Sequence, residues 1–322
     1  MRIHLARIGG PLDAPVDRLE HLASLDRRGI HAVVRDPNDA DVILFSQGHM
    51  LHGDWRLAAV SRNARAFDDS DRVMVFDERD RPWCRFPGVY VSMPASQFRP
   101  RYQRAWAYFP RPPTLPSDAP DLLFSFVGSM THRCRFPLLS LEGEDAVVEA
   151  VSGFTFYDSS SRDFAARRAR FANVLGRSRF VLCPRGQGTS SIRLYEALSV
   201  GRVPVIISDE WVPPPGPDWS RFSVRWPEGR VTGLREVLNA YDEHWPEMSA
   251  AAQEAYAEFF APAIWFHRFA ELVDEVRQEG LAGFRSRGIR QPAFWASAAH
   301  AWHGRIHGLR GRLGRRIRGD SA

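Results

Sequence analysis

The chain contains no lysine, so all 43 of its lysine-plus-arginine side chains are arginines. A phosphate-binding P-loop needs a lysine directly after its glycines, and that class of nucleotide site is therefore excluded. Cysteine is scarce as well, with only Cys84, Cys134 and Cys183. These three are widely separated and odd in number, which indicates neither a disulfide framework nor a metal site and fits a reducing cytoplasm.

Long apolar runs and a targeting segment are also lacking. No run of apolar residues approaches the roughly 18 that a membrane span needs. Met1 to Leu5 leads straight into a predicted first strand, so we expect no signal peptide. Together with the absence of lysine, this pattern favours a cytoplasmic protein from a bacterium with a GC-rich genome. No Asp-x-Asp motif stands in a suitable setting, so we expect neither a metal nor another cofactor.

The excess of positive over negative charge lies at one end of the chain. The net charge is +5, but residues 285–322 alone carry nine arginines and one acid. The rest is slightly acidic, which argues against a nucleic-acid partner. Apolar residues recur at helical spacing in this tail: Trp295, Trp302, Ile306, Leu309 and Leu313. A basic helix of this kind favours contact with the inner face of an anionic membrane, but its glycines leave a solvated or packed terminus as the alternative.

The length of 322 residues predicts two domains. Short apolar strands alternate with helical patterns along most of the chain, which indicates two α/β domains with parallel sheets. The proline-rich stretch 111–120 is the best linker, because proline makes a semi-rigid connector. We therefore divide the chain into a domain at 1–115, a domain at 116–284 and the basic tail at 285–322.

The stretch 180–208 organises the second of these domains. Residues 180–183 are a buried strand, 185–189 a loop with two glycines, 192–200 a helix and 203–207 the next strand. Gly186 and Gly188 let the backbone approach a ligand closely. Ser190 or Ser191 is a good N-cap, and Gly201 ends the helix. This order is one βαβ unit of a parallel sheet.

The loop and helix start of this unit suit a negatively charged ligand. Free backbone N–H groups at a helix N-terminus bind phosphate, and Arg185 and Arg193 add fixed positive charge. Glu196 shares a helix face with Arg193 and can accept hydrogen bonds from two ribose hydroxyls. The alternative is that Arg193 and Glu196 only pair with each other, or that Glu196 complements the helix dipole. A dinucleotide fingerprint is a weak match, because Ser191 stands where its third glycine is needed.

Residues 179–224 resemble the C-terminal half of the exostosin family of glycosyltransferases. The shared pattern is Leu-Cys-Pro, a glycine loop, Ser-x-Arg-Leu-x-Glu-Ala, Pro-Val-Ile-Ile-Ser-Asp and Trp-Ser-x-Phe-Ser-Val. The matching residues are Cys183, Pro184, Ser191, Arg193, Leu194, Glu196, Ala197, Gly201, Pro204, Ser208, Asp209, Trp219 and Phe222. The resemblance implies a GT-B fold, with two Rossmann-like domains facing each other across a cleft. It also implies an inverting transfer from a nucleotide-sugar donor, with uridine diphosphate sugars favoured, and without a metal.

The resemblance further implies that the second domain holds the donor. The loop after its first strand carries Gly128 and then Arg133 or Arg135, which suit a diphosphate; an exposed basic helix start is the alternative. Asp209 or Glu210 could contact the donor sugar, and Trp211 could stack on it or lie in the core. The donor set is thus Gly128, Arg133, Arg185, Gly186, Gly188, Ser190, Ser191, Arg193, Glu196 and Asp209.

The first domain is expected to receive the acceptor and to supply the general base that an inverting transfer needs. His49, Asp77 and Asp80 follow predicted strands, and strand C-ends line the ligand crevice of an open parallel sheet. Asp77 and His49 are the preferred candidates. The alternatives are a solvated loop histidine and a charged turn with internal ion pairs.

The sequence therefore predicts an inverting glycosyltransferase that acts on a glycan, a lipid-linked glycan or another hydroxyl acceptor. One rival is a non-catalytic subunit that binds glycan or nucleotide through a glycosyltransferase-like fold. The other is a different nucleotide-using α/β enzyme, such as an oxidoreductase.

Overall fold

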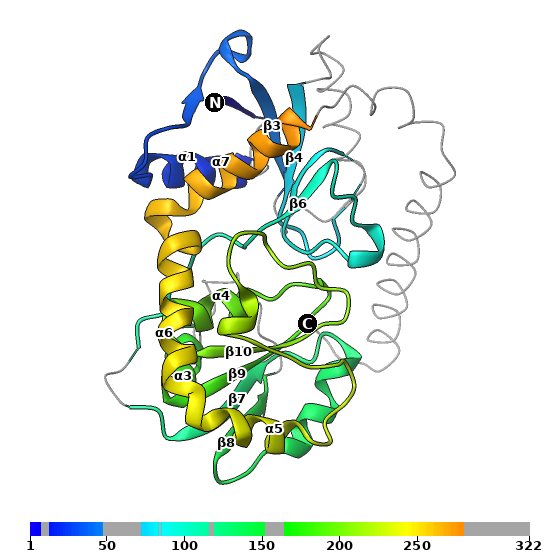
Figure 1. Cartoon of the computed structure of the whole chain (residues 1–322), viewed down its shortest axis with the longest axis vertical. Coiled ribbons are helices and arrows are strands. Elements are labelled where there is room, and N and C mark those ends of the chain that lie inside the picture. Colours follow the sequence, from blue (N-terminus) through cyan, green and yellow to red (C-terminus); the bar gives the residue numbers. More distant parts are fainter. Residues whose placement is uncertain are drawn as a thin grey trace, which may run out of the picture.

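The computed structural model describes residues 1–7, 13–47, 72–82, 84, 86–115, 119–151 and 164–279. The predicted base candidate His49 and the tail 285–322 lie outside these ranges. Two sheets build the molecule, one above the other in the long direction (Figure 1). Both are formed by strands rich in apolar residues, as expected for strands buried on both faces.

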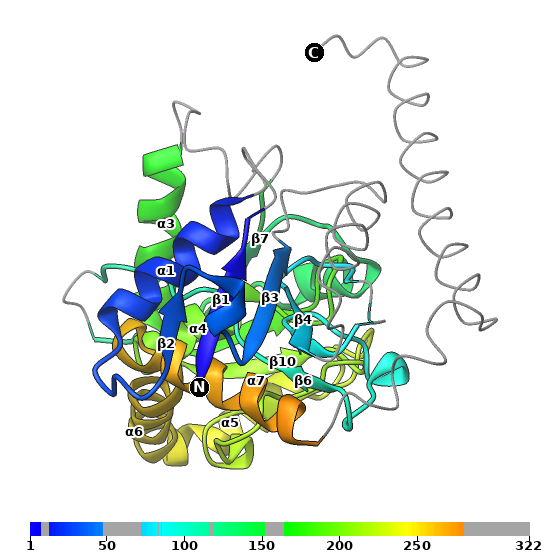
Figure 2. The same ribbon diagram turned by 90° about the horizontal axis from the view of Figure 1, so that it is seen from above.

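The first sheet has the strand order β2-β1-β3-β4-β5-β6, and every pair is parallel. From above, β2, β1, β3 and β4 follow one another across the sheet with α1 alongside (Figure 2). The strands are β1 (Arg2–Ala6), β2 (Ala32–Val34), β3 (Val42–Gln47), β4 (Val73–Asp77), β5 (Gly88–Tyr90) and β6 (Gln103–Ala105).

The second sheet has the order β11-β10-β9-β7-β8 and is also parallel throughout. Its centre is the pair β9 and β10, in which Val205 lies opposite Leu182. The strands are β7 (Leu122–Gly128), β8 (Ala146–Ala150), β9 (Ser178–Pro184), β10 (Val203–Ile207) and β11 (Val224–Arg225).

Helices flank both sheets. Those described are α1 (Ala14–Leu25), α3 (Phe164–Arg177), α4 (Ile192–Ser199), α5 (Leu234–Tyr241), α6 (Trp245–Ala255), a π-helical turn at Tyr256–Phe260 and α7 (Pro262–Gln278). Short 3₁₀ turns lie at Pro37–Asp39, Ala95–Gln97, Arg133–Arg135, Pro137–Leu141, Trp219–Arg221 and Asp242–His244. Within the described ranges, none of the helices is both long and apolar enough to cross a membrane.

The last described helix returns to the first sheet. α6 runs along the second domain beside α4, and α7 packs against α1, β5 and β6 (Figure 1). The ring of Trp265 in α7 lies 5.9 Å from that of Phe76 and 6.0 Å from that of Trp106, both in the first domain. The division predicted from the sequence counted residues 262–278 with the second domain, but their apolar face covers the first sheet.

The two domains face each other through the carboxyl ends of their strands. Pro94, beyond β5, forms an antiparallel bridge with Trp211, beyond β10. The Ala95 N–H donates to the Glu210 carbonyl at 2.9 Å. Two parallel α/β units opposed in this way confirm the predicted pair of Rossmann-like domains and the GT-B class.

Candidate active site

The glycine loop between β9 and α4 lies where the two domains meet. The Thr189 hydroxyl donates to the Met93 carbonyl of the first domain at 3.2 Å. A Cβ atom at Gly188 would lie 2.6 Å from the Ser92 hydroxyl oxygen and 2.9 Å from the Asp80 carbonyl oxygen. Only glycine allows this approach without displacement of backbone, so the sequence places the loop directly against the first domain.

The second glycine of the loop faces its own domain. A Cβ atom at Gly186 would lie 3.1 Å from both the Thr131 hydroxyl and Nη2 of Arg135. We predicted that both glycines admit a ligand. In this structure other groups of the protein lie close to both glycines. Contact between these glycines and the donor stays a prediction.

Arg135 holds two loops of the second domain together. Its guanidinium donates from Nε to the Arg185 carbonyl at 2.8 Å, from Nη1 to the Ser129 carbonyl at 2.6 Å and from Nη2 to the Pro184 carbonyl at 3.1 Å. The residue is only 8% exposed. Burial, followed by the charge of Arg193, lowers the pKa of Arg135 to about 10. The sequence left open whether Arg133 or Arg135 serves the site; Arg133 is exposed and Arg135 is built into the loops.

Arg193 lies beneath the end of β7. Its Nη2 donates to the Val127 carbonyl at 2.7 Å, and its guanidinium lies 4.6 Å from the ring centre of Phe126. Any side chain at Gly128 would collide with the same guanidinium, so the position of Arg193 requires a glycine there. Burial lowers the pKa of Arg193. Arg193 thus supports the strand end, and its predicted contact with a diphosphate stays a prediction.

Glu196 is 3% exposed and pairs with Arg168 of α3, whose Nη1 lies 3.2 Å from Oε1. Desolvation raises the pKa of the Glu196 carboxyl, although the charges of Arg168 and Arg193 oppose that shift. The sequence suggested Arg193 as the alternative partner, and the structure places Arg168 there. An ion pair from α3 could not be read from spacing along α4.

The remaining predicted donor residues have mainly local partners. Ser190 is buried, and Ser191 is the N-cap residue of α4 but makes no side-chain cap bond among the described residues. Nη1 of Arg185 lies 3.7 Å from Oε1 of Glu228. Asp209 and Glu228 are tied reciprocally: the Asp209 N–H donates to Glu228 at 3.0 Å, and the Glu228 N–H donates to Asp209 at 3.2 Å.

Two further residues that could have met the donor sugar are part of the scaffold. The Glu210 carboxylate accepts bonds from the Ser96 N–H at 2.9 Å and the Ser96 hydroxyl at 2.7 Å. Trp211 is buried, and its ring meets that of Trp219 edge-on at 5.0 Å. The core alternative therefore holds for Trp211, and Glu210 fastens the domains to each other.

The base candidates of the first domain differ in their surroundings. Asp77 is buried and bound by Arg79, whose Nε lies 2.9 Å from Oδ1 and whose Nη2 lies 2.5 Å from Oδ2. The alternative of an internal ion pair is thus observed for Asp77. Asp80 is exposed, accepts a hydrogen bond from the Tyr108 hydroxyl at 3.1 Å and lies beside Gly188. Of the described candidates, Asp80 is the one that is exposed.

Sequence reasoning missed Glu78, between these two aspartates. It is 2% exposed and pairs with Arg18 of α1. Burial is the main cause that raises its pKa to about 7, against the opposing charges of Arg18 and Arg111. Arg111 also acts on Glu196 in the second domain. The available signal for Glu78 was a charged residue directly after a buried strand. Its partners Arg18 and Arg111 come from distant elements and could not be predicted from that signal.

Glu78→Gln is expected to stabilise the protein at alkaline pH. The folded state retains a proton that the unfolded chain releases between its ordinary pKa of 4.5 and about 7. The free energy of unfolding therefore falls as pH rises through this window, by about 3 kcal/mol. Glutamine carries no charge to desolvate, so urea denaturation should find the variant about 2–3 kcal/mol more stable at about pH 8 and nearly unchanged at about pH 4.

The matched control is Glu20→Gln, which alters an exposed carboxylate paired with Arg7 and should show no such pH dependence. A Glu78→Gln protein that is less stable than the parent at alkaline pH would mean that the Arg18 ion pair outweighs the cost of desolvation.

Comparisons with known proteins identify the family of the chain. The family profile described as Exostosin GT47 domain matches residues 49–241, which is more than half of the chain. The chain is 32% identical over 79 residues to "Probable glycosyltransferase At5g03795" of Arabidopsis thaliana, covering 24% of this chain and 15% of that protein. It is 36% identical over 73 residues to "Exostosin-1 homolog" of Caenorhabditis elegans, covering 22% and 19%. The matched segments are thus less than a fifth of either relative.

Among solved structures, the crystal structure of TarM gives a TM-score of 0.41 at 8% identity, over 72% of this chain and 54% of that one. The family match covers β4, β5 and β6 of the first sheet and the whole of the second sheet, and it ends with α5. The chain belongs to the exostosin GT47 family of glycosyltransferases.

Proposed function

We propose that the chain transfers a sugar, with inversion, from a uridine diphosphate sugar to a hydroxyl group of a glycan. The second domain holds the donor and the first domain the acceptor. The observation that carries this proposal is the meeting of the two sets of strand ends, where the Gly188 loop touches Asp80 and Ser92. Ligands of parallel α/β sheets bind at such edges, and here two such edges meet.

The donor diphosphate is assigned to the amino end of α4 and the loop before it. Backbone N–H groups and the helix dipole favour a negative charge there. Arg185, half-buried, and Arg133, exposed, are the side chains available to a phosphate. Arg135 and Arg193 act from behind by holding the strand ends. Glu196 is assigned to the ribose, which requires the carboxylate to exchange or share its Arg168 bond.

The transfer step needs a base and a stabilised leaving group. We assign Asp80 as the base: its carboxylate takes the proton of the acceptor hydroxyl, the hydroxyl oxygen bonds to the anomeric carbon, and the bond to the diphosphate breaks. The pair of electrons leaves with the nucleoside diphosphate, whose charge the arginines and loop amides stabilise. This arrangement asks for no metal in the transfer itself.

A thermal-shift screen of the purified chain against UDP, GDP, CMP, ADP, dTDP and NAD tests the donor site. We expect selective stabilisation by UDP, about 2.7 kcal/mol at a concentration one hundred times its dissociation constant. Glu196→Gln should weaken this shift strongly. Glu149→Gln alters a carboxylate that pairs with Arg170 of α3, the helix that also carries Arg168, and should leave the thermal shift unchanged.

Other outcomes lead to other readings. Stabilisation by UDP without any sugar transfer or donor hydrolysis would favour the non-catalytic binding subunit. Stabilisation by NAD alone would favour an oxidoreductase. If no nucleotide produces a thermal shift, the donor-site assignment is contradicted. The cytoplasmic location, a lipid-linked acceptor and membrane contact through residues 285–322 stay predictions from the sequence.

A further inference from the structure

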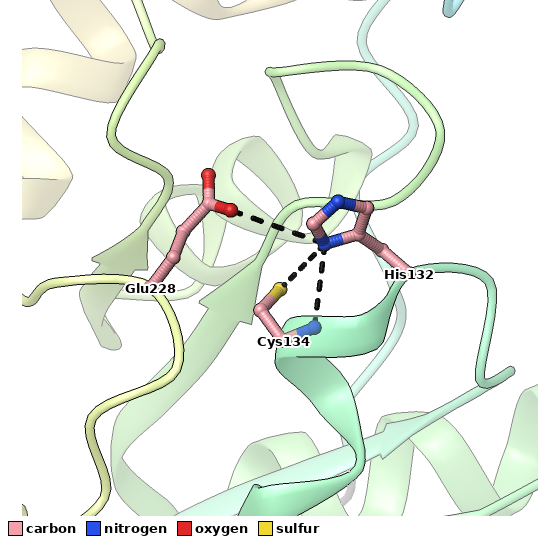
Figure 3. A group of neighbouring side chains, drawn as sticks. All are labelled: His132, Cys134 and Glu228. Atoms are coloured by element: carbon pink, nitrogen blue, oxygen red, sulfur yellow. Dashed lines mark hydrogen bonds and ion pairs between the residues drawn. The ribbon is translucent and has the colours of Figure 1, made fainter.

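Three potential metal ligands converge beside the donor loop. His132 and Cys134 flank the first residue of the 3₁₀ turn Arg133–Arg135, and Glu228 comes from the loop after β11. Nδ1 of His132 lies 3.1 Å from Sγ of Cys134 and 4.0 Å from Oε2 of Glu228. One ligand atom from each residue lies within 4.8 Å of the others, and the three side chains point toward one another (Figure 3).

These separations fit a tetrahedral zinc ion. Zinc bonds to sulfur at about 2.3 Å and to nitrogen or oxygen at about 2.0–2.2 Å, so its ligand atoms lie roughly 3.3–3.6 Å apart. The observed distances of 3.1 and 4.0 Å lie on either side of that range. Binding of an ion would therefore shorten the His132–Glu228 separation by about 0.4–0.7 Å and lengthen the His132–Cys134 separation by about 0.2–0.5 Å.

The surroundings hold these side chains in place. The backbone of the turn is fixed by the Arg135 guanidinium, which binds the Ser129 and Arg185 carbonyls. Glu228 is anchored through Oε1, which accepts the Asp209 N–H at 3.0 Å and lies 3.7 Å from Nη1 of Arg185. Its other oxygen, Oε2, faces His132. Such outer contacts orient metal ligands and are part of a metal site.

The ligand types select the metal. A thiolate and an imidazole suit zinc and similar transition metals, whereas magnesium and calcium take oxygen ligands. A thiolate and a carboxylate together neutralise a divalent cation, so the bound ion would add no net charge beside Arg133, Arg135 and Arg185. Three protein ligands leave a fourth position for water or another oxygen.

We propose that His132, Cys134 and Glu228 bind one zinc-class cation that ties the loop after β7 to the loop after β11. The site does not depend on the proposed function, and the ion takes no part in the transfer step assigned above. The rival explanation is a small polar cluster in which His132 only accepts the Cys134 N–H, 3.3 Å from Nδ1.

Cobalt titration of the full chain, stripped with a chelator and freed of any affinity tag, tests the site. Co²⁺ bound to a thiolate shows charge-transfer absorption that binding to surface histidines does not give. We expect this absorption to saturate at one Co²⁺ per chain and to be displaced by Zn²⁺. Cys134→Ser should abolish it, and Glu228→Gln should weaken Zn²⁺ binding by at least about 10-fold, the smallest effect seen even for residues that only support a ligand.

Cys84→Ser is the matched control, because it removes another buried thiol in the first domain and should bind Co²⁺ as the parent does. No saturable thiolate absorption, or equal absorption in Cys134→Ser, would overturn the proposal. The nucleotide-induced thermal shift is measured on the same proteins. A shift that persists in Cys134→Ser shows that loss of the metal and loss of the donor site are separate results.

Discussion

Arg135→Ala is expected to lower the free energy of unfolding by about 3–4 kcal/mol, although no carboxylate pairs with this arginine in the hydrogen bonds described. The guanidinium binds three carbonyls that belong to two loops. Alanine removes a charge-assisted hydrogen bond from each carbonyl, each worth about 1.5–3 kcal/mol, although the Ser129 carbonyl keeps the Thr131 N–H at 2.9 Å and the Arg185 carbonyl keeps the Cys134 thiol at 3.8 Å. The loss is smaller than the sum, because removal of a buried charge also removes its desolvation cost.

That desolvation cost is visible in the pKa of Arg135, which burial lowers to about 10. The arginine is therefore retained for the geometry it imposes on the Arg185 and Ser129 carbonyls and not for its charge. Arg135→Lys tests this distinction. Lysine keeps a positive charge but cannot present the planar fork that reaches three carbonyls at once, so we expect it to recover less than half of the lost stability.

Urea denaturation measures both variants, with Arg133→Ala as the matched control. Arg133 lies two residues away and is exposed, and its replacement should change stability by less than about 0.5 kcal/mol. The expected consequence for function is weaker nucleotide binding in Arg135→Ala, since the loop that begins at Arg185 loses its anchor. Equal stability of Arg135→Ala and Arg133→Ala would contradict the role given to the buried guanidinium.

The unit around the glycine loop is the part of the fold that the sequence predicts best. The predicted strand 203–207 is observed as Val203–Ile207, and the predicted helix 192–200 as Ile192–Ser199. Local signals determine these bounds: an apolar run sets a buried strand, and Gly201, with φ of +67°, ends the helix. These signals lie within the unit itself, so they suffice to place its bounds, although β9 also pairs with the distant strand β7.

Distant contacts explain what the sequence could not predict. The pattern of α7 predicts a helix but not which of two similar sheets it covers, and the turn at Tyr256–Phe260 followed by Pro262 directs it back to the first one. The roles of the arginines depend on burial in the same way. Arg193 and Arg135 bind carbonyls of other elements, a property that a pattern rich in arginine does not reveal.

Asp80→Asn is expected to lower kcat by about 10²–10⁴-fold, the usual contribution of general base catalysis. Asparagine keeps the size of the side chain and can still accept the Tyr108 hydrogen bond, 3.1 Å long in this structure. It cannot take a proton from the acceptor hydroxyl. The rate is measured as release of nucleoside diphosphate from the donor that the thermal screen identifies, with and without acceptor. Donor affinity should stay the same, because Asp80 belongs to the other domain.

Two aspartate controls separate loss of the base from loss of structure. Asp39→Asn alters an exposed aspartate near β3 and should affect neither rate nor stability. Asp77→Asn should mainly destabilise the fold, by about 3–5 kcal/mol, because it leaves the Arg79 guanidinium without its charged partner. If Asp80→Asn keeps its rate within about threefold, less than the smallest effect expected of a general base, the base is not Asp80. His49, at the other predicted strand end, would then be the next residue to replace.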